Sequence, residues 1–159
     1  MEPRNRPRAR DFIVISSGGA FQPFRYSLGR HASKFFEELR DRGRLFGVRC
    51  PGCRKVYCPP RAVCGPCWRE TGEWVEVGPA GTLTAFTILR FAFIDPETGQ
   101  TKPVPYGYAF IKLDGADTCF QHFLKIDAAR PPKIGMRLAP VFEDERRGTL
   151  RDIRHFEPA

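Results

Sequence analysis

Four cysteines in two Cys-x-x-C pairs are the residues of this sequence best suited to chemistry. Cys50 and Cys53 flank Pro-Gly, and Cys64 and Cys67 flank Gly-Pro. Glycine and proline permit the tight turn in which backbone amides face two thiolates, and two such turns can place four sulfurs tetrahedrally about 2.3 Å from one zinc ion. The ten residues between the pairs are enough for one short strand and its return. This spacing predicts a four-cysteine zinc ribbon.

The second pair also raises a redox alternative, because it reads CGPC. A redox-active Cys-x-x-C opens a helix, whose dipole lowers the pKa of the attacking thiol. Here the pair precedes WRETGEW, which is too short and too interrupted by glycine for that helix. Zinc is therefore favoured over redox chemistry. Four thiolates close the shell of the ion and leave no position for a Lewis-acid role, so the predicted metal is structural.

The remaining cysteines and the histidines are expected to be structural. Cys58 lies before Pro-Pro, between the two pairs, and is expected to pack as a small apolar residue. Cys119 lies in an alternating, strand-like segment, and His31, His122 and His155 stand far apart in the sequence. The sequence contains no glycine-rich phosphate loop and no HExxH motif. No catalytic residue is predicted.

The second half of the sequence favours short strands separated by turn residues. Five segments within about eighty residues have this character: GTLTAFTILRF, YGYAFIKLDG, TCFQHFLKI, GMRLAPVFEDE and TLRDIRHF. Five strands fit a small barrel better than a sandwich, which usually needs seven. In the first segment, alternation predicts one face formed by Leu83, Ala85, Thr87 and Leu89.

A long proline-rich loop separates the first two of these segments. Residues 91–106 contain a DPETG turn and three prolines, together with Phe91, Phe93 and Tyr106. Loops of this length in a compact domain are often functional. The aromatic residues are expected either to cover the end of the barrel or to contact a partner.

The first half begins with an arm and a helix. MEPRNRPRAR has four arginines and two prolines in ten residues and cannot build a core, so residues 1–28 are expected to form a flexible arm in which DFIVISSGGAFQPF could add a short strand. A helix is predicted at about 31–42, with Ser33 as its N-cap and Gly43 as its C-terminal stop. Its apolar residues Phe35, Phe36 and Leu39 have helical spacing.

Charge and hydropathy exclude some functions. The net charge is +8, but residues 1–72 carry 15 basic and 6 acidic side chains, whereas residues 73–159 carry 11 and 12. The barrel half is therefore not an electrostatic site for a phosphate backbone. No stretch approaches the eighteen or so apolar residues of a membrane span, and FIVI is too short for a secretory signal. A cytoplasmic protein without membrane association is predicted.

These features together resemble one family. The sequence resembles the acyl-CoA-associated proteins that join a rubredoxin-like zinc ribbon to an OB-fold, long catalogued as a domain of unknown function. The resemblance is carried by a helix ending near Gly43, LFGVRCPGCRKVYCPPRAVCGPCW, GTLTAFTILRF, PYG before a strand, a strand ending in LDG, and IGMRLAPVFE. The resemblance spans about residues 30–157 and departs at Cys58, where the family more often has a bulky apolar residue. It implies a mainly β fold with an N-terminal helix. The implied organisation is an arm at 1–28, a helix at 29–44, a rubredoxin-like zinc ribbon at 45–74 and a five-stranded OB-fold barrel at 75–159.

The resemblance also implies a function. Members of this family are non-catalytic subunits that pair with thiolase-fold enzymes, among them thiolases, related sterol side-chain aldolases and hydroxymethylglutaryl-CoA synthases; one is the small subunit of benzoylsuccinyl-CoA thiolase. The implied role is assembly and acyl-CoA binding in a hetero-oligomer that cleaves or forms a carbon–carbon bond. The implied cofactor is structural Zn²⁺, with a coenzyme A thioester as substrate of the complex.

Coenzyme A carries phosphates, which require cationic neighbours. The basic half offers four candidate contacts on or near the ribbon, each of which could equally be a solvated surface residue: Arg49, Arg54, Lys55 and Arg61. An alternative function is a zinc-ribbon/OB nucleic-acid-binding module, because both folds occur in such proteins. The acidic balance of the barrel half makes nucleic acid the less favoured partner.

Overall fold

A computed structural model of the chain describes residues 14–15, 24–25, 27–94 and 99–159. The expected arm at 1–28 therefore lies largely outside the described residues. Within it, β1 (Val14–Ile15) pairs antiparallel with β2 (Phe24–Arg25). No helix in the described part of the chain is long and apolar enough to cross a membrane.

Helix α1 spans Gly29–Arg42 and ends where the sequence predicts. Gly43 is left-handed, with φ of 63°, and its N–H donates to the Leu39 carbonyl at 3.0 Å. Glycine takes this conformation without the steric cost of a β-carbon. The predicted N-cap is wrong, because Ser33 lies inside the helix. The first helical N–H instead donates to Ser27 Oγ at 3.1 Å.

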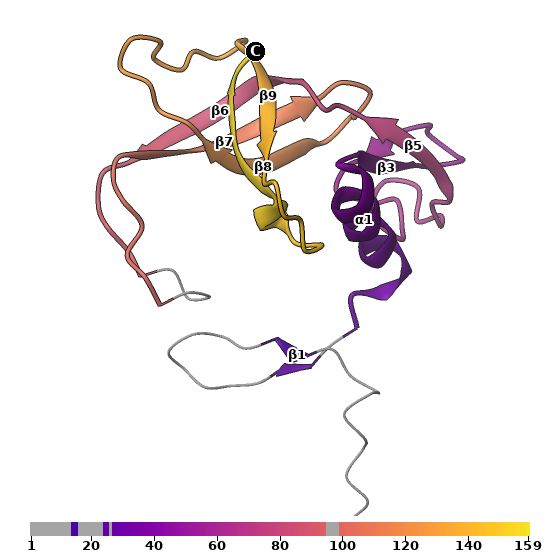
Figure 1. Cartoon of the computed structure of the whole chain (residues 1–159). Coiled ribbons are helices and arrows are strands. Elements are labelled where there is room, and N and C mark those ends of the chain that lie inside the picture. The colour runs from indigo at the N-terminus through magenta and orange to yellow at the C-terminus, as the bar shows by residue number, and fades with distance from the viewer. Residues whose placement is uncertain (1–13, 16–23, 26, 95–98) are drawn as a thin grey trace, which may run out of the picture.

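A three-stranded antiparallel sheet forms the base of the ribbon (Figure 1). Its central strand β3 (Leu45–Arg49) lies between β4 (Val56–Tyr57) and β5 (Glu73–Val77). Gly47 permits the close approach of β4, since a β-carbon there would lie 2.8 Å from the Tyr57 carbonyl oxygen. β3 thus delivers the first cysteine pair directly from its end.

The second half forms a closed barrel of five strands: β6 (Gly81–Leu89), β7 (Tyr106–Leu113), β8 (Cys119–Leu124), β9 (Arg137–Phe142) and β10 (Ile153–Pro158). Their order around the barrel is β10-β8-β7-β6-β9. All pairings are antiparallel except that of β10 with β8. A 3-10 turn, η1 (Leu150–Asp152), precedes the last strand. The mainly β fold with a helix, a ribbon and a five-stranded barrel is confirmed.

The face predicted for β6 is wrong beyond its third residue. The register with β7 shifts between Leu83 and Ala85, which marks a β-bulge. Leu83 is buried, whereas Ala85 and Thr87 are exposed, and Phe86 packs against the core instead. One extra residue in a strand reverses the alternation of every residue after it.

One hydrophobic core joins the helix, the ribbon and the barrel. Phe35 of α1 and Phe120 of β8 both lie in it, with ring centroids 6.4 Å apart. Two hydrogen bonds also cross the junction: Val56 N–H donates to the carboxylate oxygen Asp117 Oδ2 at 2.8 Å, and Asp117 N–H donates to the Val56 carbonyl at 2.9 Å. The ribbon is therefore fixed on the barrel.

Candidate metal centre

The two Cys-x-x-C pairs form two turns of the same backbone design. In the first, Cys50 N–H donates to the Lys55 carbonyl at 2.9 Å and Arg54 N–H donates to the Cys50 carbonyl at 3.0 Å. In the second, Cys64 N–H donates to the Arg69 carbonyl and Trp68 N–H donates to the Cys64 carbonyl, both at 2.9 Å. The two hairpin turns are therefore equivalent, and we call them the first and second knuckles (residues 50–55 and 64–69).

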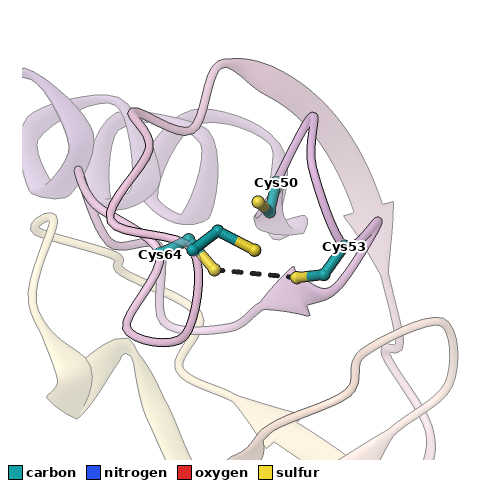
Figure 2. Close-up of side chains that lie close together, drawn as sticks. Cys50, Cys53 and Cys64 are labelled. Carbon is teal, nitrogen blue, oxygen red and sulfur yellow. Dashed lines mark hydrogen bonds between the residues drawn. The ribbon is translucent and has the colours of Figure 1, made fainter.

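The knuckles bring the four predicted cysteines together. Their sulfur atoms all lie within 4.8 Å of one another, and the Cys53 and Cys64 Sγ atoms are 3.6 Å apart (Figure 2). Tetrahedral zinc–thiolate bonds of 2.3 Å place sulfurs about 3.8 Å apart. Cys50 and Cys64 are buried, while Cys67 is half-buried and Cys53 exposed. The four sulfurs thus match the donor set and the spacing of a zinc site.

Backbone and side-chain donors surround these sulfurs. Gly52 N–H lies 3.3 Å from Cys50 Sγ, as a knuckle turn requires. The hydroxyl of Tyr57, which is buried in β4, lies 3.2 Å from Cys64 Sγ. Its hydrogen bond lowers the pKa of Cys64 to about 6, and the same contact raises the pKa of Tyr57 to about 12. Tyr57 therefore favours a thiolate at Cys64.

The thiol of Cys67 resists ionisation. The pKa of Cys67 is raised to about 12, mainly by the hydrogen bond with Cys53 and then by burial. Four sulfurs this close cannot all become thiolates without a neighbouring positive charge. A divalent cation supplies that charge, so the chemistry of the donor set also fits zinc.

Cys58 packs in the core, as the sequence predicts. It is buried beside apolar residues of the helix and barrel, and burial raises the pKa of its thiol to about 12. Its backbone N–H donates to Thr118 Oγ1 and its carbonyl accepts from the same hydroxyl, both at 2.9 Å. Cys119 is exposed on β8, with its sulfur 3.5 Å from Thr84 Oγ1.

Two of the four basic candidates lie beside one carboxylate. Arg49 Nε and Arg54 Nη1 form ion pairs with Glu73 at 3.1 and 3.3 Å. The other two flank the ring of Tyr57: Lys55 Nζ lies 5.9 Å and Arg61 Cζ 5.7 Å from its centroid. The Glu73 pairs reduce the charge that Arg49 and Arg54 offer to a ligand.

A shallow depression lies beside the first knuckle. It is lined by Cys53, Arg54, Lys55 and Asp117, so it brings together two of the basic candidates. Asp117 adds a carboxylate that already accepts from the Val56 N–H. The depression lies where the ribbon meets the barrel. Because its lining carries both positive and negative side chains, it does not by itself define an anion site.

Sequence reasoning missed Tyr57 and Glu73. Both lie on strands flanking β3, and their contacts with the knuckles follow from sheet register rather than from the cysteine motif. A buried tyrosine requires a partner for its hydroxyl, but only the structure shows that Tyr57 is buried. Among the described residues, the four clustered cysteines are the only group with metal-ligand geometry.

The histidines are dispersed, as expected. His122 is buried in the barrel, where its ring stacks on Phe120 with centroids 5.9 Å apart. Its Nε2 lies 2.9 Å from the Leu150 carbonyl. His31 stacks on Trp74 with centroids 5.7 Å apart. His31 and His122 are therefore engaged in ring packing, while His155 Nε2 lies 3.5 Å from the Glu157 carboxylate.

The fold and the cysteine cluster define a protein that joins a zinc-ribbon module to an OB-fold barrel. Comparisons with known families agree. The family model described as "ChsH2, rubredoxin-like zinc ribbon domain" matches residues 38–72, and that described as "ChsH2, C-terminal OB-fold domain" matches residues 74–143. A DUF35 domain-containing scaffold protein of Methanocaldococcus jannaschii is 32% identical over 131 residues, covering 77% of this chain and 87% of that protein. The chain belongs to the DUF35 zinc-ribbon/OB-fold family, which confirms the resemblance seen in the sequence.

Solved structures share the same fold. A DUF35 protein of unknown function from Sulfolobus solfataricus has a TM-score of 0.58 at 16% identity, over 82% of this chain and 87% of that chain. The structure described as the Ltp2-ChsH2(DUF35) aldolase has a TM-score of 0.59 at 22% identity, over 84% of this chain and 98% of that chain. At these identities the likeness concerns architecture.

Proposed function

We propose that this chain is the non-catalytic scaffold subunit of a thiolase-fold acyl-CoA enzyme. In this proposal its four clustered cysteines bind one structural zinc ion, and the chain supports assembly and acyl-CoA binding during CoA-dependent carbon–carbon bond cleavage or formation. The observation that carries the proposal is the four-sulfur cluster: with four thiolate ligands, zinc has no open position for substrate or water. The metal would then hold the ribbon in shape and leave the chemistry to a partner.

Two further observations support a partner. The M. jannaschii relative is described as a scaffold protein, and the Ltp2-ChsH2(DUF35) structure is described as an aldolase that contains a DUF35 chain. Exposed apolar side chains also lie on the loop between β6 and β7, whose described parts project from the barrel (Figure 1): Phe91, Phe93, Ile94 and Val104. Clustered exposed apolar residues are typical of interaction surfaces.

The test is co-expression with a thiolase-like protein encoded in the neighbourhood of its gene, where one is found. We expect that protein to co-purify with a tag on this chain, and only the complex to catalyse CoA-dependent cleavage. Activity of this chain alone would contradict a non-catalytic role. Failure of any thiolase-like neighbour to co-purify would contradict the partnership.

A second test concerns acyl-CoA. Charge reversal of all four basic candidates should raise the KM of the assembled enzyme for its CoA substrates, with most of the effect from Lys55 and Arg61, because Arg49 and Arg54 share Glu73. An unchanged KM would remove these residues from the acyl-CoA site. The variants also need an unchanged zinc content, which separates loss of binding from loss of the ribbon.

Nucleic-acid binding is the competing function. Three aromatic rings on the outer face of β7 and β8 pack edge-on against each other: Tyr106 and Tyr108 lie 5.9 and 5.7 Å from Phe123. Lys102 Nζ lies 3.5 Å from the centroid of the Phe123 ring. These rings are engaged with one another, and the barrel half has no basic excess. Micromolar, salt-sensitive binding of a single-stranded oligonucleotide, measured by fluorescence anisotropy, would instead favour this function.

A further inference from the structure

The second knuckle presents an exposed tryptophan. Trp68 directly follows the last cysteine of the cluster, and 85% of its surface is exposed, the largest value among the exposed apolar side chains of the described residues. Its backbone N–H is engaged by the Cys64 carbonyl at 2.9 Å, so the knuckle fixes where the side chain starts. Val63, which pairs with Glu70 at the base of the same knuckle, is also exposed.

The backbone at Trp68 disfavours a bulky side chain. Its φ is 53°, in the left-handed region, and the equivalent residue of the first knuckle, Arg54, has φ of 65°. Glycine takes this conformation freely, whereas a β-carbon there is crowded by the backbone. Folding of the knuckle alone therefore favours glycine at position 68. The folding of the knuckle therefore does not explain a bulky, exposed indole at this position, which leaves binding as a role for the side chain.

The ribbon that carries this tryptophan has an excess of positive charge. Between residues 50 and 70 the chain carries four basic residues and one acidic residue, Glu70. Arg61 and Arg69 belong to no ion pair within the described part of the chain. The Arg69 side chain reaches across to the first knuckle, where its Cδ lies 3.4 Å from the position of a β-carbon on Gly52. The ribbon thus combines one highly exposed apolar side chain, Trp68, with arginines that have no acidic partner among the described residues.

The shape of this surface favours a protein over a nucleotide. A nucleotide site would pair a ring with a concavity lined by phosphate-binding cations, but the depression on the ribbon is lined by residues of the first knuckle and the barrel, not by Trp68. A projecting indole with an arginine rim instead has the composition of a protein-interface hot spot, in which a tryptophan fills a pocket of the partner.

We infer that Trp68 is the anchor by which the ribbon docks into an apolar pocket with an acidic rim on the partner subunit. This inference rests on the proposed function, since the partner is the thiolase-fold protein. The indole supplies the buried centre of the contact, and Arg61 and Arg69 supply charge complementarity to the rim. The metal cluster positions the anchor, because both knuckles depend on the cysteines that they carry.

The variant Trp68→Gly tests the anchor without endangering the fold, because glycine suits the left-handed backbone. The control is Ile134→Ala, which shortens an apolar side chain of similar exposure, 72%, just before β9 and outside both knuckles. Binding of the zinc-loaded full chain to the purified thiolase-fold partner is measured by surface plasmon resonance. We expect Trp68→Gly to weaken binding by about 30-fold or more, mainly through faster dissociation. Ile134→Ala should bind nearly as the parent does.

The rim is tested by the double variant Arg61→Glu, Arg69→Glu. Rim charges act on association, so this variant should associate about tenfold more slowly at low salt and lose the salt dependence of the rate. Zinc content and melting temperature, measured for every variant, must match those of the parent chain. A salt-independent association rate for the parent chain would contradict the inference that the partner's pocket has an acidic rim.

Three results would overturn the anchor. If Trp68→Gly binds the partner as tightly as the parent chain does, Trp68 is not the anchor, although the proposed function stands. If the parent chain binds no thiolase-fold partner, both the proposed function and this inference fail. If an oligonucleotide or free coenzyme A quenches tryptophan fluorescence in the parent chain and not in Trp68→Gly, the indole is assigned to a nucleotide instead.

Discussion

Removing the Tyr57 hydroxyl is expected to weaken zinc binding while leaving the ribbon folded. The hydroxyl lies 3.2 Å from Cys64 Sγ, and Tyr57 is 4% exposed. Tyr57→Phe keeps the buried ring between Lys55 and Arg61 and deletes only the hydrogen bond to the thiolate. Without this donor the thiolate form of Cys64, which binds the metal, is less stabilised by the protein.

The size of the effect follows from the position of the hydroxyl. Deleting a hydrogen-bond partner of a metal ligand typically reduces metal affinity by about 10- to 100-fold. That range equals about 1.4 to 2.8 kcal/mol, which agrees with the ~1.5–3 kcal/mol of a hydrogen bond to a charged group. We expect Tyr57→Phe to lie in this range because the contact is buried and water cannot replace the lost donor easily.

The assay is competition for zinc between the protein and a chromophoric chelator at fixed pH, since protons compete with zinc for thiolates. The matched control is Tyr108→Phe, which removes a hydroxyl from the outer face of the barrel on β7, away from the cysteine cluster. Circular dichroism with zinc in excess checks that both variants are folded. A zinc affinity of Tyr57→Phe within twofold of the parent chain would refute the role assigned to this hydroxyl.

The other predictions concern the cysteines and the barrel histidine. Serine at any one of the four clustered cysteines should abolish zinc binding and unfold the ribbon, because the energy of metal binding is energy of folding; folded, zinc-free parent protein would contradict this. Cys58→Ser should keep one zinc per chain by metal analysis but lower the free energy of unfolding by about 1–3 kcal/mol, because it buries a hydroxyl among apolar groups. Burial lowers the pKa of His122 from its ordinary value, so its neutral form stabilises the fold above pH ~6.5 and this contribution is lost as the pH falls through the folded-state pKa. Urea unfolding at pH 7.5 and pH 5 should therefore show a smaller loss of stability for His122→Leu than for the parent chain; equal losses would exclude His122 as the cause.

Local sequence was sufficient wherever a short segment dictates its own geometry. The Pro-Gly and Gly-Pro inserts make knuckle turns whichever barrel follows them, and the four sulfurs converge as their spacing predicts. Gly43 ends α1 because the left-handed residue after a helix is a property of the backbone alone. The five strands of the barrel were likewise visible as alternating segments between turns. The family resemblance rests on these same local motifs.

Tertiary structure decided the contacts that depend on register and on distant segments. The bulge in β6 reverses which side chains enter the barrel, and no residue of GTLTAFTILRF marks it, because it arises from pairing with β7. The ion pairs of Glu73 with Arg49 and Arg54 and the bond from Tyr57 to Cys64 need β3, β4 and β5 to be side by side. The sequence alone therefore determined which residues can bind the metal. Only the packed sheet determined which neighbours tune those residues, because hydrogen bonds and ion pairs act over a few ångströms in space and not along the chain.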